Sequence, residues 1–464
     1  MGVELVGERE AVRIMRLKRK WSKIAPHWKL RTTLIALAAA GLASGSLVAA
    51  TGGAASASSG SKPLVVWVDS ARIPNVKAYE KAHPKVKIDL VTYDGDDATG
   101  TLQSKFALYN RVGKGWPDVF FSEENYDASS LGDSQYNDLG VLNNGLIPKS
   151  VLDKWAPGTL ASCTFNGKIL CLRNDIGQDV LWVNTALMTK FGYTVPSTWA
   201  QWQTLGEEVS QQHPGYIVGT VGDTWDDEVY LQASQCPMAE LQNAYTVEID
   251  PSSPNCTRVG KLLDPMISDG SVPVANVYAP TFVSQYGAKT LMVIGPSWYG
   301  DYLFAGSSGV DPTAGQIAAY PPLTWTTGQA PTTGDVGGGL WFISSHTKQP
   351  KLAASMIQWL ATNFASQGIA PTFPAYQPDE APWVAKQVAG GYFANSSTLG
   401  TVLEKAAGEI WTGWSPLRFV TDFTFGSTVI PALTGGTSFS AELPAFGTAL
   451  ADAAQVDGYT VVSK

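Results

Sequence analysis

Histidine and cysteine are scarce in this sequence, with four of each among 464 residues. Only His83, His213 and His346 follow the first 57 residues, and no Gly-x-Ser-x-Gly motif occurs. These two observations argue against a hydrolase that uses a Ser-His pair. No two cysteines are spaced Cys-x-x-Cys and none has a histidine nearby, which disfavours a zinc site. We therefore predict a chain without a metal and without a cofactor.

Basic residues are also in short supply once the N-terminal 57 residues are set aside. That segment holds nine of the 32 basic and three of the 40 acidic residues, which leaves 23 and 37 and a net charge of −14. Nucleic-acid binding needs a basic face, so this balance argues against it. With 44% hydrophobic and 16% charged residues, the remaining chain has a globular composition and is long enough for two lobes with cores of their own.

The first 57 residues have the features of a secretory signal peptide. Nine Lys and Arg residues lie within 9–31, an apolar Ala-rich run covers 34–50, and Ala55-Ser56-Ala57 provides small residues for cleavage. We expect export to the extracellular space or cell surface; an uncleaved membrane anchor is the alternative. No cysteine lies near the cleavage site, so the sequence gives no support for a lipid anchor.

Four cysteines in an exported chain indicate disulfides. Three pairings are possible, and Cys163–Cys171 is favoured because an Asn-Gly turn lies between two short strands in CTFNGKILC. Cys236 and Cys256 would then close a Pro-containing loop.

After residue 61 the chain opens with a β-α-β pattern. Strands are predicted at 63–69, 86–94 and 119–121, and helices at 73–84 and 97–112. In open α/β sheets, ligands bind beyond the carboxyl ends of the strands. The charged residues at such ends are therefore candidates for one binding cleft: Asp69, Arg72, Asp94, Glu123 and Glu124.

Seven motifs occur in an order that resembles the extracellular solute-binding proteins of bacterial ABC importers, in the maltose- and oligosaccharide-binding group called family 1. They are VVWVD with KAYEKAHPKVKIDL, GKGWPDVFFSE, NGKILCLRNDIGQDVLWVNTALMTKFGYTVPSTWAQW, YGAKTLMVIGPSWYGDYL, IAAYPPL and GGGLWFISSHTKQPKLAASMIQWLA. The resemblance covers nearly all of residues 62–450. The stretch CLRND departs from the Gly-Leu-Pro-containing sequence more usual in such proteins.

This resemblance implies an α/β fold of two lobes, each a β-sheet flanked by helices, joined by crossing hinge strands with the ligand between them. Lobe 1 would comprise 62–175 and 325–371, and lobe 2 would comprise 176–324 and 372–464. Residues 173–179 would form a crossing strand that bends at Gly177, with Asn174, Asp175 and Gln178 facing the ligand.

Sugars present flat C–H faces that stack on aromatic rings, and the sequence holds 16 tryptophans. Trp298, in GPSWYGD, matches the stacking tryptophan of many such proteins. Trp225, which follows a strand predicted at 215–223, is a further candidate. The remaining aromatic candidates are Trp341 and Trp414 and, more weakly, Tyr126 and Tyr376.

The expected function is that of a non-enzymatic binding protein that captures a mono- or oligosaccharide and delivers it to a membrane permease. We expect a monomer with no nucleic-acid partner. Two alternatives remain open at this point: the same fold binding a cation such as a polyamine, and a secreted glycoside hydrolase. The hydrolase would need two carboxylates flanking one bond, which adjacent residues on a strand do not supply.

Overall fold

The computed structural model describes residues 62–93, 101–133, 137–305, 310 and 314–463. All of them belong to one compact unit, Gly60–Lys464. The expected signal peptide and the candidate Asp94 lie outside the described residues. Among the helices that are described, none combines the length and the apolar character needed to cross a membrane.

The first sheet has five strands in the order β2-β1-β3-β13-β6. Strand β1 runs parallel to β2 and β3, whereas β13 runs antiparallel to β3 and β6. The strands are β1 (Leu64–Val68), β2 (Ile88–Thr92), β3 (Val119–Ser122), β6 (Cys171–Arg173) and β13 (Leu340–Ile343). A strand from late in the chain therefore completes the sheet begun by the predicted β-α-β unit.

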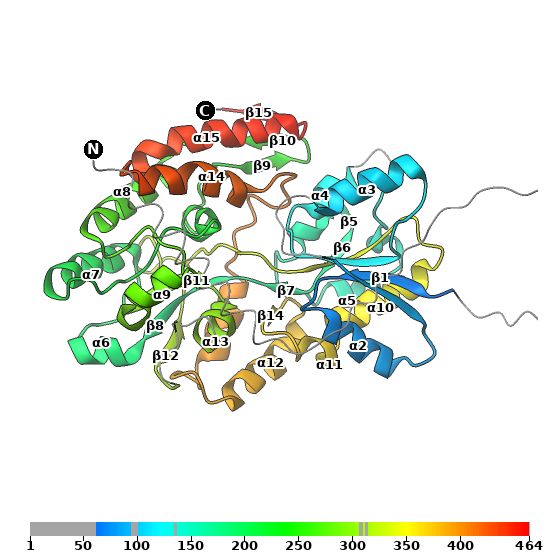
Figure 1. Ribbon diagram of the computed structural model, residues 1–464, viewed down its shortest axis with the longest axis horizontal. Helices are drawn as coiled ribbons and strands as arrows, with labels where there is room; N and C mark the ends of the chain where they lie inside the picture. Colours follow the sequence, from blue (N-terminus) through cyan, green and yellow to red (C-terminus); the bar gives the residue numbers. More distant parts are fainter. Residues whose placement is uncertain (1–61, 94–100, 134–136, 306–309, 311–313, 464) are drawn as a thin grey trace, which may run out of the picture. The chain divides into compact units, whose positions relative to one another are not determined.

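Helices cover both faces of this sheet (Figure 1), because alternate residues of its strands point to opposite sides. Val119 and Phe121 of β3 belong to one core with α2 and α10, whereas Phe120 packs against Phe106 of α3 on the other face. The helices around this sheet are α2 (Ile73–Ala82), α3 (Thr101–Val112), α4 (Asp127–Gly132), α5 (Lys149–Leu152), α10 (Pro350–Thr362) and α11 (Phe364–Gln367).

A second sheet has three antiparallel strands in the order β11-β8-β12. Its middle strand β8 buries all six residues, so both faces must be covered. Leu181 and Val183 pack with Trp199 and Trp202, while Trp182 faces the core that contains α13. The elements are β8 (Asp179–Asn184), β11 (Met292–Pro296), β12 (Ile317–Tyr320), α6 (Thr185–Phe191), α7 (Trp199–Gln212), α9 (Pro280–Tyr286) and α13 (Leu399–Ala407).

Three segments run between these two sheets and lie against one another. Residues 174–178 lead from β6 into β8, residues 332–339 lead into β13, and residues 371–376 lead from α11 into α12. They are joined by pairing of β7 (Asp175–Ile176) with β14 (Phe373–Pro374) and by a bridge between Gln178 and Asp335. Two further segments therefore run beside the one that was predicted to cross between two lobes.

The C-terminal part adds helices beside the second sheet and a third, smaller sheet in the order β15-β10-β9 (Figure 1). The sequence patterns did not reveal α12 or α14. The elements are β9 (Glu240–Asn243), β10 (Thr246–Glu248), β15 (Thr460–Val462), α8 (Pro254–Asp269), α12 (Gln377–Ala389), α14 (Thr421–Thr434) and α15 (Phe439–Val456).

Both predicted disulfides are confirmed: Cys163 bonds Cys171, and Cys236 bonds Cys256. The first closes the short hairpin of β4 (Thr164–Phe165) and β5 (Lys168–Ile169). The strand predicted at 215–223 is wrong. In that stretch Ile217 forms an isolated parallel bridge with Thr290, and Val218 donates to the carbonyl of Ser271, so no strand ladder is built.

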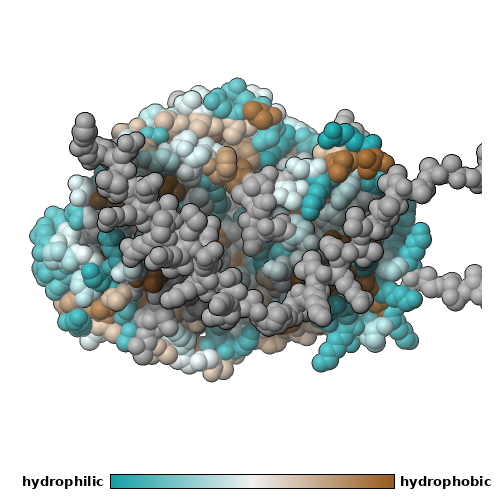
Figure 2. Space-filling model, viewed as in Figure 1, coloured by the Kyte–Doolittle hydropathy of each residue, from teal (hydrophilic) through white to brown (hydrophobic). Residues whose placement is uncertain are grey.

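The surface is largely hydrophilic on the face shown in Figure 2. A brown patch lies over α3, whose Leu108 and Val112 are 50% and 53% exposed. These two residues, one helical turn apart, form only a small apolar stripe.

Candidate functional site

A cavity of about 340 Å³, here called the aromatic cavity, lies at the carboxyl ends of β1 and β3. It is bounded by elements of both large sheets and by all three connecting segments. Its lining residues are Ala71, Arg72, Glu123, Asp175, Tyr278, Trp298, Tyr302, Gly337, Gly338 and Thr372. The rule that ligands bind beyond the ends of parallel strands therefore leads to a real cavity here.

Arg72 is the charged centre of this cavity. Its guanidinium pairs closely with Glu123, and lies 3.6 Å from Asp69 and 3.7 Å from Asp175. It also stacks on Phe121, with its central carbon 4.4 Å from the ring centroid. Burial alone would lower the pKa of Arg72, but the carboxylates of Asp175, Glu123 and Asp69 outweigh it and raise that pKa. Arg72 is a permanent cation surrounded by three acidic groups.

Trp298 forms an aromatic wall and is fixed to the connecting segments. Its indole N–H donates to the carbonyl of Val336 at 3.0 Å, and its ring lies nearly parallel to that of Tyr278 with centroids 6.4 Å apart. Trp225 stands behind it at 5.8 Å and donates its own indole N–H to the hydroxyl of Tyr299. Trp298 therefore lines the cavity, and Trp225 supports it.

Three buried polar atoms of the cavity lining have no hydrogen-bond partner among the described residues: Asp175 Oδ2, Thr372 Oγ1 and Tyr278 Oη. Asp175 is fully buried and Thr372 is 8% exposed. The other carboxylate oxygen of Asp175 accepts from the backbone N–H of Gly339 at 2.6 Å, so the side chain is held in place. Buried polar groups are normally satisfied, and all three of these atoms belong to residues that line this cavity, where hydroxyl or similar groups of a ligand could satisfy them.

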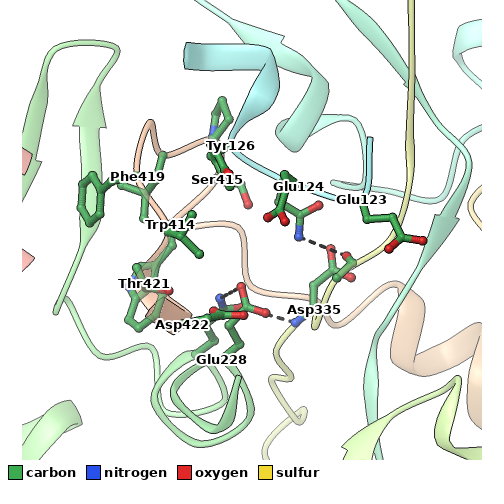
Figure 3. Close-up of a pocket in the computed structure, with 16 residues that line it drawn as sticks. Glu123, Glu124, Tyr126, Glu228, Asp335, Trp414, Ser415, Phe419, Thr421 and Asp422 are labelled. Carbon is green, nitrogen blue, oxygen red and sulfur yellow. Dashed lines mark hydrogen bonds between the residues drawn. The ribbon is translucent and has the colours of Figure 1, made fainter. Parts of the chain in front are cut away.

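A second cavity of about 70 Å³, here called the acidic cavity, shares Glu123 and Gly337 with the first (Figure 3). At about 10–15 Å³ per water molecule, it has room for roughly five waters. The lining residues are Glu123, Glu124, Asn125, Tyr126, Glu228, Gln232, Asp335, Gly337, Trp414, Ser415, Pro416, Leu417, Phe419, Val420, Thr421 and Asp422.

Carboxyl groups crowd one another in the acidic cavity. Burial raises the pKa of Asp422 to about 7. Burial, followed by the nearby Asp422 and Asp227, also raises the pKa of Glu228 well above its usual range. In Figure 3, Glu228 and Asp422 lie side by side below Asp335. These groups can hold protons near neutral pH and so can both donate and accept hydrogen bonds.

Most of the sequence-predicted residues come together at the two cavities. Arg72, Glu123, Asp175 and Trp298 line the aromatic cavity. Glu124, Tyr126 and Trp414 line the acidic cavity, where Trp414 is largely buried and donates its indole N–H to the carbonyl of Cys236. Asp69 stands beside Arg72 and accepts the backbone N–H of that residue.

Two predicted aromatic residues are placed elsewhere. Trp341 is 1% exposed in β13, which lies between β3 and β6; it donates to Asn174 and packs on Phe121. Tyr376 is 8% exposed and packs against Trp155. Neither is among the lining residues of the two cavities, because the core between sheet and helices takes up both rings.

Asn174 and Gln178 also do not face the cavity, contrary to expectation. Asn174 accepts hydrogen bonds from Trp341 and Gln367, and Gln178 donates to the carbonyl of Leu403. Gly177 is required for a different reason than bending, because a Cβ there would lie 2.0 Å from the carbonyl oxygen of Val336. The crossing segment is packed on all sides, and of these residues only Asp175 lines the cavity.

Sequence reasoning missed several lining residues, among them Tyr278, Tyr302, Thr372, Glu228 and Asp422. Tyr278 and Thr372 lie in irregular segments where no strand end marks them. Glu228 directly follows the acidic pair Asp226-Asp227, which was the one signal available.

Comparison with known proteins agrees with this geometry. Residues 68–236 match the family model described as "Bacterial extracellular solute-binding protein". The fold is that of a solute-binding protein. The structure of the galacto-N-biose- and lacto-N-biose I-binding protein of a Bifidobacterium longum ABC transporter superposes with a TM-score of 0.71 at 15% identity. That superposition covers 87% of this chain and 99% of the other. The two-lobed α/β fold expected from the sequence is therefore confirmed, and the family model matches the part of the chain from residue 68 to residue 236.

Two curated solute-binding proteins show sequence similarity. An arabinooligosaccharide-binding protein of Bacillus subtilis is 24% identical over 325 residues, which span 65% of this chain and 70% of that protein. An uncharacterised ABC transporter extracellular-binding protein of Pyrococcus horikoshii is 24% identical over 305 residues. That match spans 62% of this chain and 64% of the Pyrococcus protein, just under two thirds of its length.

Proposed function

We propose that this chain is the extracellular substrate-binding component of an ABC importer and that it captures a carbohydrate in the aromatic cavity. The observation that carries the proposal is that Asp175, Thr372 and Tyr278, each with an unsatisfied buried polar atom, all line a cavity walled by Trp298. An indole face offers stacking to the C–H face of a sugar ring. The polar atoms are positioned to exchange hydrogen bonds with its hydroxyl groups.

The proposed lobes meet at this cavity. Lobe 1 (62–175 and 325–371) would contribute Arg72 and Glu123, and lobe 2 (176–324 and 372–464) would contribute Tyr278, Trp298 and Thr372. Closure of one lobe against the other about the three connecting segments would bring both sets onto the sugar. Micromolar affinity needs about −8 kcal/mol, which a stacked ring and a few buried hydrogen bonds can supply.

Release to membrane permease subunits would complete the transport step, and we expect no chemical change in the ligand. The lining groups are suited to binding: Arg72 is held by three carboxylates and Trp298 by a backbone carbonyl. Such a component works outside the cytoplasmic membrane, in keeping with the signal-like residues 1–57.

Thermal unfolding of the purified protein against a panel of mono- and disaccharides tests this proposal. A ligand that binds only the folded state must raise the midpoint, by an amount that grows with its concentration above the dissociation constant. A concentration-dependent rise with at least one sugar is the expected result. A flat response to every sugar at millimolar concentration would contradict the proposal, and a polyamine arm shows whether a cation binds instead.

A further inference from the structure

Acidic side chains outnumber basic ones by far in the walls of both cavities. Arg72 is the one lysine or arginine among the described residues that line them. The carboxyl-bearing lining residues are Glu123, Glu124, Asp175, Glu228, Asp335 and Asp422. The internal segments outside the described residues contain no lysine or arginine in the sequence.

The charge of Arg72 is already compensated within the protein. Three carboxylates surround it, those of Glu123, Asp69 and Asp175. Its guanidinium is also seated on the ring of Phe121. The three carboxylates outweigh the positive charge of Arg72, so the region around it is net negative. An anionic ligand would therefore be repelled there.

The surroundings of Asp175 also disfavour an anionic ligand. Its Oδ2 atom is buried, lacks a hydrogen-bond partner and lies 3.7 Å from Arg72. Asp175 can accept a hydrogen bond from a ligand, whereas a second carboxylate at that position would meet like charge in a water-poor site. Hydroxyl or ammonium groups satisfy it, and carboxylate, sulfate or phosphate groups do not.

Glu123 extends this field from one cavity to the other. It lines both and pairs with Arg72. On the far side, Glu228 and Asp422 lie next to each other with no basic residue among the described lining. The net negative charge therefore belongs to the aromatic cavity and reaches the acidic cavity through Glu123, whereas Glu228 and Asp422 can hold protons near neutral pH.

We propose, resting on the proposed function, that this site selects saccharides by charge: it accepts neutral or amine-bearing sugars and rejects sugars that carry an anionic group. Glu123 and Asp175 are the specificity-determining residues, because together with Asp69 they outnumber the single positive charge of Arg72. Specificity of this kind arises from repulsion of the wrong ligand as much as from attraction of the right one.

The test uses matched sugars that differ in one group. Binding of glucose, galactose and their disaccharides is measured by calorimetry beside glucuronate, galacturonate and digalacturonate, with glucosamine and galactosamine as the cationic set. Each uronate is expected to bind at least about tenfold more weakly than its neutral parent, with the amino sugar no weaker than the parent. The gap should narrow as salt is raised, since screening weakens repulsion.

Two variants test whether charge or shape excludes the uronates. Glu123→Gln and Asp175→Asn keep side-chain size and remove one negative charge each, and each should shrink the uronate-to-neutral ratio at least threefold. Asp153→Asn, an exposed residue paired with Lys149, is the matched control and should leave the ratio unchanged. Equal binding of uronates and neutral sugars to the wild type would overturn the inference. So would a ratio that neither variant alters, which would point to steric exclusion. Failure of all neutral and amino sugars would instead remove the proposed function itself.

Discussion

Arg173 and Asp335 form a buried salt bridge, with Nη2 and Oδ2 2.9 Å apart, that joins two of the segments running between the large sheets. Arg173 is 1% exposed and uses its remaining donors on the carbonyls of Asp175 and Gly337 and on the hydroxyl of Ser162. One guanidinium thus fixes the backbone at Asp175 and Gly337, both of which line the aromatic cavity.

Arg173→Ala should therefore destabilise the protein strongly. Loss of one partner leaves the Asp335 carboxylate in a poorly solvated position, at a cost of about 3–5 kcal/mol. Urea unfolding measures the change. Arg173→Ala with Asp335→Asn should recover part of the loss, because the stranded charge is gone. Lys149→Ala, which breaks an exposed pair with Asp153, is the control and should cost under about 1 kcal/mol. Equal effects at the two sites would contradict this reading.

Trp298→Ala should abolish or greatly weaken sugar binding while the fold persists. A buried tryptophan face in a binding site contributes about 2 kcal/mol or more, so the dissociation constant should rise at least tenfold. Calorimetry with a sugar that shifts the unfolding midpoint measures it. Trp116→Ala is the matched control: that ring is also half-buried and donates to Asn110, but it stacks on His346 away from both cavities. If the two variants lose the same affinity, Trp298 is not a ligand residue.

The first sheet and the charged half of the site could be read from the sequence. Regular spacing of apolar residues and Pro74 at a helix start predicted the β-α-β unit, and the strand-end rule then led to Arg72 and Glu123. Such features are local, so a single stretch of sequence carries them.

The remaining part of the site depends on contacts between distant segments. Asp422 and Glu228 line the same cavity although nearly two hundred residues separate them in the sequence. No local sequence pattern predicts that they lie close together. Trp341 follows the glycines at 337–339 and was expected at the ligand, but it is buried in β13. The unbroken apolar stretch Leu340–Ile343 is typical of a central strand covered on both faces, and that signal should have taken precedence.

Gly177→Ala should damage both stability and binding. The added Cβ would lie 2.0 Å from the carbonyl oxygen of Val336, the same oxygen that holds the indole of Trp298. Relief of that clash must shift the backbone, at a cost of about 1–3 kcal/mol, and must displace Trp298. Urea unfolding and calorimetry measure the two effects. Gly408→Ala, whose Cβ would meet nothing nearer than 3.5 Å, should be neutral or slightly stabilising. A neutral Gly177→Ala would show that the segment tolerates the shift.

Asp127 should make stability depend on pH. Burial raises its pKa from 3.8 to about 7, although the Ser122 hydroxyl donates to it at 2.6 Å. Between these values the native state holds a proton that the unfolded chain has released, so the free energy of unfolding falls as pH rises from about 4 to 7. Asp127→Asn removes this contribution and should flatten the slope. Urea unfolding at pH 5 and 8 measures it, with the exposed Asp89→Asn as control. An unchanged slope in Asp127→Asn would contradict the assignment.

The two disulfides should stabilise the protein independently of each other. Cys163–Cys171 closes a separation of 8 residues and lies in the core cluster under α3, whereas Cys236–Cys256 closes a separation of 20 residues in the core of the second sheet. Loop-closure entropy predicts about 2.5 and 3 kcal/mol respectively. Because the sites share no partners, the loss in a variant with all four cysteines replaced by alanine should equal the sum of the two pairwise losses within about 0.5 kcal/mol. Urea unfolding of the three variants measures this. If the variant without any cysteine loses less stability than the sum of the two pairwise losses, the two disulfides are not independent. Removal of one disulfide would then already reduce the contribution of the other.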